Sequence, residues 1–218
     1  MTERIRGKDC EDTGCCATPL APQPFAGPGE ADFPPPFAAR FSPPGADVFE
    51  MAARAAQAGE LGAADILWSA DDLDLYLALV LEPDVAAAAA RAMREVMLVA
   101  VRDALSSLLP PQVGIGVLRD GSITVNDGRM GTVRMDMPPC ANEACPAWMV
   151  VGAHIRLRHA QGVEGGQDTH VTVLAEEGGA HIPPAAVASE IARHFLTALD
   201  TWRHEGEDSL RQSLASRV

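Results

Sequence analysis

The sequence predicts an α/β protein of the α+β sandwich type, with a mainly antiparallel sheet and helices packed on one face of it. Strand-like segments follow one another directly in two runs, and the helix-like segments stand apart from those runs. Neighbouring strands joined by short turns pair antiparallel, and separate helices then cover the sheet. At 218 residues, 47% of them hydrophobic, the chain is long enough for one domain with a core and a tail.

The first part of the chain is rich in proline. Nine prolines lie between Thr18 and Pro44, a density that disfavours helix and sheet alike. We therefore expect residues 1–32 to be a mobile tail and residues 33–218 to form the domain. Order is expected to begin near Phe33, because aromatic rings among prolines can dock on a core.

Capping residues and apolar patterns define the first half of the domain. Asp47 is a typical N-cap, which predicts a helix over residues 47–58. Apolar, strand-like segments follow at residues 63–69 and 74–82. Residues 85–109 would place apolar side chains almost all round a helix, so we expect this helix to be buried.

A β-hairpin and a closing helix define the second half. Residues 122–126 alternate polar and apolar side chains, and residues 129–137 resume a strand. Asn126, Asp127 and Gly128 between them tolerate the left-handed backbone of a tight turn. The remaining expected elements are strands at residues 113–117, 148–158 and 169–174 and a helix at residues 184–204.

Charge and hydropathy exclude several classes of partner. The net charge is −13, from 30 acidic and 17 basic residues, which argues against binding of nucleic acid or of an anionic membrane surface. No apolar run is long enough to cross a bilayer, and the first residues lack the apolar segment of a signal peptide. We expect a cytoplasmic protein with no membrane and no nucleic-acid partner.

The five cysteines are expected to be reduced thiols, since their number is odd and no export signal precedes them. The alternative is a zinc site, but the ligand spacing is looser than in structural zinc sites. It would combine Cys10, Cys15 and Cys16 with Cys140 and Cys145. The histidines form no helical i, i+4 pair and no HExxH motif. No metal site is therefore expected.

The hairpin resembles the active-site hairpin of the biotin/lipoate protein ligase family, and the order of elements over residues 33–206 is similar to that family's order. The resemblance implies a ligase-like fold and a groove for a small carboxylic acid or acyl ligand. If the activity is retained, it also implies activation of biotin or lipoate with ATP. A carrier-domain protein would then be the acceptor of the acyl group.

The family's catalytic lysine, just past the hairpin turn, is missing. The chain has one lysine, Lys8. An alignment on residues 123–125 puts Arg129 at the lysine's position, and an alignment on Gly131 puts Gly128 there. Arg129 is our candidate catalytic residue, because a permanent cation can polarise a carboxylate or bind a phosphoryl oxygen. Arginine is planar and broader than lysine, so geometry built for an ammonium group need not survive.

Two other landmarks of the family are also altered. Its Gly-Arg-rich loop corresponds to residues 69–73, which contain neither glycine nor arginine, so an acidic surface turn is the favoured interpretation. Its Trp-Pro-Asn-Asp segment before the hairpin is replaced by residues 118–121, which end at Gly121. In the hairpin, ligand contacts are expected from Gly121, Asn126, Gly131 and Arg134; the alternative is a solvated strand face.

The family's Gly-rich strand corresponds to residues 150–156. Gly152 is kept, His154 replaces a second glycine, and Arg156 replaces an asparagine. His154, Arg156 and Arg158 share one strand face, and a basic row facing a pocket would suit an acidic ligand. The alternative is that the row faces water and that Gly152 only marks a bulge or twist.

Two functions remain open. The chain is either a divergent ligase-like protein that binds a small carboxylic acid or acyl ligand, or a non-catalytic ligand- or protein-binding module on the same fold. A third idea, a thiolate acting as in related octanoyl transferases, would need Cys140 or Cys145 beside Arg134. The missing lysine and loop favour binding without acid activation.

Overall fold

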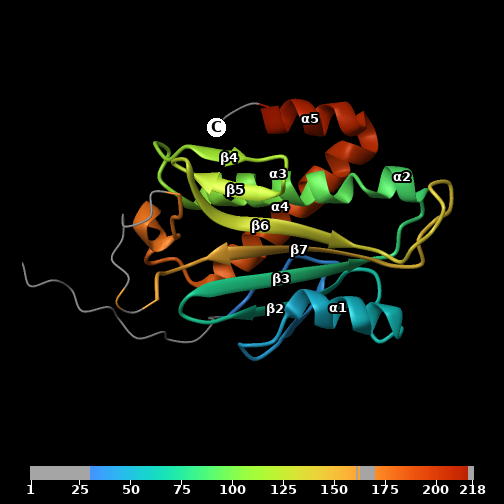
Figure 1. Cartoon of the computed structure of the whole chain (residues 1–218), viewed down its shortest axis with the longest axis horizontal. Coiled ribbons are helices and arrows are strands. Elements are labelled where there is room, and N and C mark those ends of the chain that lie inside the picture. The colour runs from blue at the N-terminus through green and yellow to red at the C-terminus, as the bar shows by residue number, and fades with distance from the viewer. Residues whose placement is uncertain (1–29, 161, 163–169, 216–218) are drawn as a thin grey trace, which may run out of the picture.

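The computed structural model describes residues 30–160, 162 and 170–215. One seven-stranded sheet runs in the order β1-β2-β3-β7-β6-β5-β4, and all neighbours pair antiparallel except β1 and β2 (Figure 1). The strands are β1 Ala38–Phe41, β2 Asp65–Ala70, β3 Asp74–Leu81, β4 Ile115–Val117, β5 Ser122–Val125, β6 Gly128–Asp136 and β7 Met149–Arg156. The helices are α1 Val48–Gln57, α2 Ala87–Ala90, α3 Met93–Leu108, α4 Pro184–Glu205, α5 Glu207–Ala215 and the π-helical turn η1 Ala175–Gly179.

The predicted fold class is confirmed, with one difference in the layers. Helices α3 and α4 cover one face of the sheet, whereas α1 packs on the opposite face against β3 and β7 (Figure 1). The central strands bury apolar side chains on both faces: Leu77 and Leu79 lie toward α3 and α4, and Ala78 and Val80 lie toward α1. A strand that is apolar on both sides needs cover on both sides.

Helix α1 begins at its predicted cap. The Asp47 carboxylate accepts hydrogen bonds from the backbone N–H groups of Phe49 and Glu50, both at 3.1 Å. Gly59 follows the helix with a φ of 72°, the left-handed backbone that favours glycine. These two residues fix where the helix begins and ends, as the sequence predicted.

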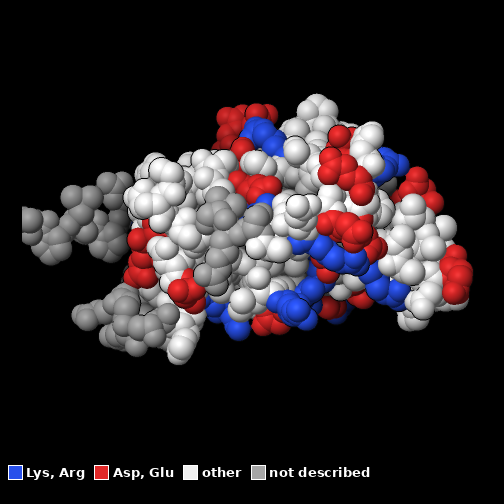
Figure 2. Space-filling model, turned by 90° about the horizontal axis from the view of Figure 1, so that it is seen from above, with Lys and Arg blue, Asp and Glu red and all other residues white. Residues whose placement is uncertain are grey.

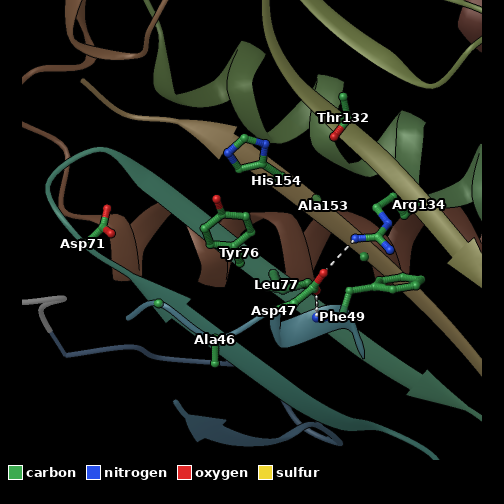
Figure 3. Close-up of a pocket in the computed structure, with 12 residues that line it drawn as sticks. Ala46, Asp47, Phe49, Asp71, Tyr76, Leu77, Thr132, Arg134, Ala153 and His154 are labelled. Atoms are coloured by element: carbon green, nitrogen blue, oxygen red, sulfur yellow. Dashed lines mark hydrogen bonds and ion pairs between the residues drawn. The ribbon is translucent and has the colours of Figure 1, made fainter. Parts of the chain in front are cut away.

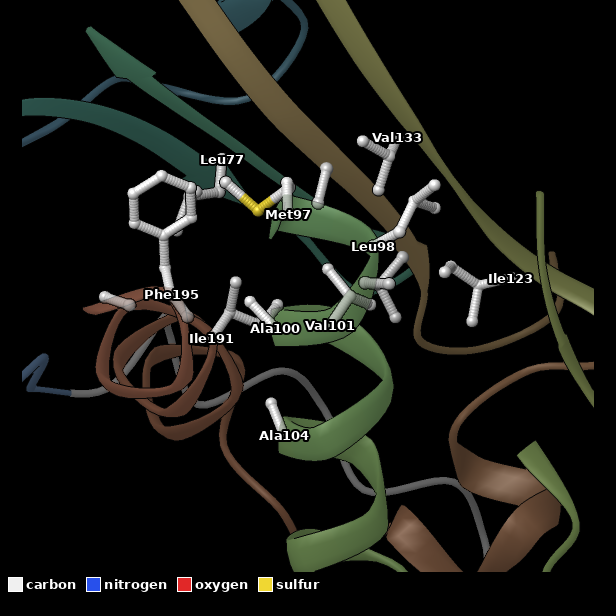
Figure 4. Close-up of a cluster of buried hydrophobic side chains, with 14 of the residues drawn as sticks. Leu77, Met97, Leu98, Ala100, Val101, Ala104, Ile123, Val133, Ile191 and Phe195 are labelled. Carbon is white, nitrogen blue, oxygen red and sulfur yellow. The ribbon is translucent and has the colours of Figure 1, made fainter. Parts of the chain in front are cut away.

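The predicted long helix is interrupted. It forms as α2 and α3, with Arg91 and Ala92 in a turn between them. The first N–H groups of α2 donate to the carbonyl oxygens of Ala144 and Asn142 in the β6–β7 loop, at 2.8 and 3.0 Å. The loop therefore supplies acceptors for the N–H groups at the start of α2. Helix α3 begins separately and packs against the sheet. Figure 4 shows the resulting core, in which Met97 of α3 lies against Phe195 of α4.

The hairpin of β5 and β6 is confirmed with its turn. Asn126 and Asp127 both have positive φ, 47° and 67°, as a two-residue hairpin turn requires. Ile123 pairs with Gly131 and Thr124 pairs with Arg129, so the register shifts at Met130. Met130 is buried in the core by this shift. A Cβ atom at Gly131 would lie 2.3 Å from the carbonyl oxygen of His154, so only glycine fits there.

Three elements differ from the sequence prediction. The expected strand at residues 169–174 is wrong: in the described part, Val171 makes one isolated bridge to Arg129, and the chain then turns into η1. Strand β1 was not predicted, because all four of its residues are exposed and lie among prolines. Helix α5 was not predicted, because Gly206 is a typical helix end and only Leu210 of α5 is buried, so the segment has little apolar pattern.

The expected mobile tail, residues 1–32, falls almost wholly outside the described residues. Phe33, where order was expected to begin, places its ring edge-on to Trp68 with centroids 5.9 Å apart. Among the described helices, none combines the length and apolarity needed to cross a membrane.

Met97 provides a test of the buried helix. Its side chain is fully buried between the sheet and α4, so Met97→Asp would bury an unpaired charge. We expect the free energy of unfolding, measured by chemical denaturation, to fall by about 3–5 kcal/mol. Met51→Asp makes the same change at an exposed methionine of α1 and should alter stability by less than about 0.5 kcal/mol. Equal stability of the two variants would contradict this packing.

Candidate functional site

A groove of about 380 Å³ lies on the face of the sheet that α3 and α4 leave free, beside the N-terminus of α1 (Figure 3). Its floor is made by β3, β6 and β7, and its rim by the segment that leads into α1 and by the β2–β3 turn. The lining residues are Gly45, Ala46, Asp47, Phe49, Asp71, Tyr76, Leu77, Thr132, Arg134, Gly152, Ala153 and His154.

Gly152 shapes the floor of the groove. It pairs with Arg134 of β6 on one side and with Ala78 of β3 on the other. A Cβ atom at this position would lie 2.7 Å from the carbonyl oxygen of Leu77 and 2.8 Å from the Phe49 ring. The glycine therefore allows the Phe49 ring of α1 to approach the sheet closely.

Arg134 is the only lysine or arginine among the described residues that line the groove. Its guanidinium group lies 3.4 Å from Asp47, 3.6 Å from Glu50 and 4.4 Å from the centre of the Phe49 ring. All three charged side chains are about half exposed, so each ion pair is weak, about 0–1 kcal/mol. The arginine is held in place but is still accessible to a ligand.

Asp47 connects helix α1 to the groove. One carboxylate oxygen caps the helix and the other faces Arg134. Desolvation acts to raise the pKa of Asp47, but the hydrogen bond from the Glu50 N–H and the Arg134 guanidinium together hold that pKa below its ordinary value. Asp47 is thus ionised at neutral pH and offsets part of the charge of Arg134.

His154 and Tyr76 form the other half of the groove. The Nε2 atom of His154 lies 2.6 Å from a carboxylate oxygen of Asp74. The imidazole stacks on the Tyr76 ring, with centroids 4.6 Å apart and planes 9° from parallel. Burial, followed by the negative charges of Asp74, Asp71 and Asp47, raises the pKa of Tyr76. This end of the groove is therefore a region of negative potential.

The β2–β3 turn, which the sequence resemblance matches to the family's Gly-Arg-rich loop, is short and tightly closed. Only three residues separate the two strands. The Asp71 carboxylate accepts hydrogen bonds from the N–H groups of Leu73 and Asp74, at 2.8 and 2.9 Å, which closes the turn tightly. The acidic surface turn is the reading that this geometry supports.

Of the residues predicted to bind a ligand, Arg134, Gly152 and His154 line the groove together. The backbone of Gly131 in β6 packs against the carbonyl group of His154 in β7. The groove lining does not include Arg129, Arg156, Gly121 or Asn126.

Those four residues hold the hairpin. Arg129 lies 3.6 Å from Asp120, and its carbonyl oxygen accepts a hydrogen bond from Arg156 at 3.2 Å. The side-chain amide of Asn126 donates to Glu177 at 2.6 Å. Gly121 has a φ of 92° and lies against the Arg94 guanidinium.

Sequence reasoning missed several lining residues. It treated Asp47 only as a helix cap and Asp71 only as a surface acid, and it did not single out Tyr76 or Thr132. One signal was available: Asp74 and Tyr76 are polar at a spacing of two in the otherwise apolar strand β3. That pattern places both residues on one face, the face that becomes the groove.

Cysteine and metal chemistry find no support in the described residues. Cys140 and Cys145 are free thiols in the loop that caps α2, and neither lines the groove. Cys10, Cys15 and Cys16 lie outside the described residues. No cluster of three or more histidine, cysteine or acidic residues suited to a metal ion occurs in residues 30–160 and 170–215.

On the face seen in Figure 2, acidic and basic side chains lie side by side.

Solved structures share this fold. A biotin protein ligase-like protein of unknown function from Silicibacter sp. TM1040 matches with a TM-score of 0.76 and 29% identity, over 85% of this chain and 79% of that one. The apo biotin protein ligase of Aquifex aeolicus matches with a TM-score of 0.62 and 12% identity, over 82% and 76% of the two chains. The Leishmania major biotin protein ligase in complex with biotinyl-5-AMP matches with a TM-score of 0.61 and 14% identity, over 83% of this chain and 82% of that one.

Sequence comparison agrees with the structural one. A search among curated proteins finds no match. The profile of the biotin/lipoate A/B protein ligase family matches residues 33–216, which span nearly the whole described part of the chain. By this match and by its fold, the chain belongs to the biotin/lipoate A/B protein ligase family.

Proposed function

We propose that the chain is a divergent ligase-like protein that binds a small carboxylic acid or acyl ligand in the groove, with Arg134 as its polar anchor. The observation that carries the proposal is the place of Arg134. It is the one lysine or arginine lining the groove within the described residues, and it pairs across the sheet with Gly152. Biotin protein ligases with this fold bind biotin, ATP or biotinyl-5-AMP.

The charges of the groove oppose acid activation with ATP. A transferring nucleotide phosphate needs cations around it, and electrostatic stabilisation is usually the largest contribution to such a step. The groove offers Arg134 against Asp47 and Asp71, with Asp74 just behind His154. Asp71 also closes the turn where the family's phosphate loop would be.

The same charges favour a neutral acyl group over a free carboxylate. Arg134 already faces two carboxylates, so a third would be repelled by both. A thioester, ester or amide carbonyl carries no charge and can still accept a hydrogen bond from the guanidinium group. We therefore place an acyl carbonyl at Arg134 and the ligand's apolar part along the Phe49 and Tyr76 rings, since the side chains of Leu77 and Ala153 face the core under α3.

Arg129, our candidate from the sequence, has a supporting place in this proposal. Its pairing with Asp120 and the hydrogen bond from Arg156 to its carbonyl oxygen stabilise the strand that presents Arg134. A carrier-domain protein remains a candidate donor or acceptor of the acyl group. The net charge of −13 would slow its encounter with an acidic carrier.

Acid activation is tested by ATP-pyrophosphate exchange in the presence of biotin, lipoate or octanoate. We expect no exchange above background, because the groove lacks the cations that would offset charge on the phosphoryl group. An authentic biotin protein ligase serves as the positive control for the assay. Robust exchange that Arg134→Ala or Arg129→Ala abolishes would show that an arginine has taken over the lysine's role, and would refute this part of the proposal.

Ligand binding is tested by calorimetry with octanamide and biotinamide as neutral acyl probes, and with octanoate and biotin as the matching acids. We expect the amides to bind more tightly than the acids. Arg134→Ala should weaken amide binding by about tenfold, the effect of one charge-assisted hydrogen bond.

The matched control is Arg211→Ala, which also removes an arginine paired with two carboxylates, on α5 away from the groove. It should leave binding unchanged. Arg129→Ala separates the two candidate anchors, and a larger loss for this variant than for Arg134→Ala would reverse our assignment.

A further inference from the structure

We propose that Asp74 and His154 form a general-base pair in the groove, and that the protein hydrolyses activated acyl groups, thioesters in the first place. The inference goes beyond ligand binding, but it rests on the proposed function for the position of the acyl carbonyl. It assigns a chemical role to His154. Ligand binding alone does not explain why this side chain is paired with Asp74.

The hydrogen bond between the two side chains sets the state of the imidazole. Because Asp74 accepts at 2.6 Å from Nε2 of His154, the proton of the neutral ring lies on Nε2. The Nδ1 atom then carries the lone pair. No described residue makes a hydrogen bond to Nδ1. A base held by a carboxylate on one side and free on the other is the arrangement that general-base catalysis uses.

The surrounding strands hold the imidazole in one orientation. Tyr76 stacks against one side of the ring, and both Tyr76 and Thr132 pair with His154 across the sheet. In Figure 3 the ring stands beside Tyr76, with its two nitrogens on opposite sides. His154 lines the groove and Asp74 does not, so the orienting carboxylate lies behind the base. Only about a quarter of each side chain is exposed.

The carbonyl of the ligand would lie next to the base. Arg134 and His154 are diagonal neighbours on β6 and β7, because Arg134 pairs with Gly152 and Thr132 pairs with His154. Diagonal neighbours on one sheet face are about 7–8 Å apart, which leaves room for a carbonyl group and a water molecule. Gly152 itself adds no side chain there, and the Phe49 ring packs against its backbone. Arg134 can donate to the carbonyl oxygen as negative charge develops there.

The reaction balances with water and a thioester alone. Nδ1 of His154 accepts a proton from water while the water oxygen bonds to the carbonyl carbon. The carbon–sulfur bond then breaks, and the leaving thiolate takes the proton from Nδ1. The products are a carboxylic acid and a thiol, and Asp74 stabilises the imidazolium in between. The acid product gains a charge beside Asp47 and Glu50, which favours its release.

Hydrolysis is tested with the octanoyl thioester of N-acetylcysteamine, with release of the thiol as the readout. We expect turnover above the spontaneous rate and a loss of about 100-fold or more in kcat for His154→Ala. Asp74→Asn should lower kcat by at least about tenfold with little change in KM, since it disturbs the base and not the binding of substrate. His194→Ala, which breaks a histidine–carboxylate pair on α4 away from the groove, should leave the rate unchanged.

The pH profile separates a chemical role of His154 from a structural one. The wild-type rate should fall on acidification, because a protonated imidazole cannot accept a proton, and the residual rate of His154→Ala should lack that fall. The titratable and charged groups around the imidazole are Asp71, Asp74 and Tyr76 beside it, Asp47 from the start of α1, Arg134 on β6 and Arg156 on β7.

Binding measurements on the same proteins distinguish the two proposals. If octanamide binds wild type and His154→Ala alike but the thioester is not hydrolysed above background, the general-base proposal is overturned and the binding proposal stands. A His154→Ala variant that is folded and hydrolyses at the wild-type rate overturns it as well. If octanamide does not bind the wild type, the proposed function itself fails.

Discussion

The close approach of Phe49 to the backbone at Gly152 is the constraint on which the groove depends. A Cβ atom at position 152 would collide with the Phe49 ring and the Leu77 carbonyl oxygen, so any other residue would lift α1 away from the sheet. The ring in turn lies under the guanidinium group of Arg134. Asp47, at the start of the same helix, caps α1 and pairs with Arg134. The absence of a side chain at Gly152, the Asp47 cap of α1 and the position of Arg134 therefore depend on one another.

Local sequence signals predicted the parts of the fold that depend on local chemistry. The Asp47 cap, the turn at Asn126 and Asp127 and the end of α4 at Gly206 are where the sequence placed them. Strand β1 could not be predicted, because its pairing with β2 leaves its own side chains exposed and so imposes no alternation of polar and apolar residues. The break between α2 and α3 depends on a loop distant in sequence, which no local pattern reports.

The candidate site was predicted only in part, for a related physical reason. Strand alternation and the family resemblance found Gly152, His154 and Arg134, which project onto one sheet face. The resemblance also singled out Arg129 by its place in the alignment, but the register shift at Met130 and the pairing with Asp120 keep Arg129 at the hairpin. The acidic partner of each basic side chain is determined by which residues lie close together in the folded structure. The pairs Asp47–Arg134 and Asp74–His154 join residues 80 or more positions apart, so no sequence spacing could disclose them.

The two faces of the sheet divide stability from chemistry. The face under α3 and α4 carries the large buried cluster around Met97 and Phe195, and a substitution there is expected to destabilise the whole domain (Figure 4). The opposite face is covered by α1 over part of its area and carries half-exposed polar residues in the groove, and these polar side chains can change at little cost to the fold. This explains how a chain of this family can keep the family fold while the residues of the groove vary. It also means that the fold alone does not specify the chemistry of this chain, so the proposals above rest on Asp74, His154 and Arg134 themselves.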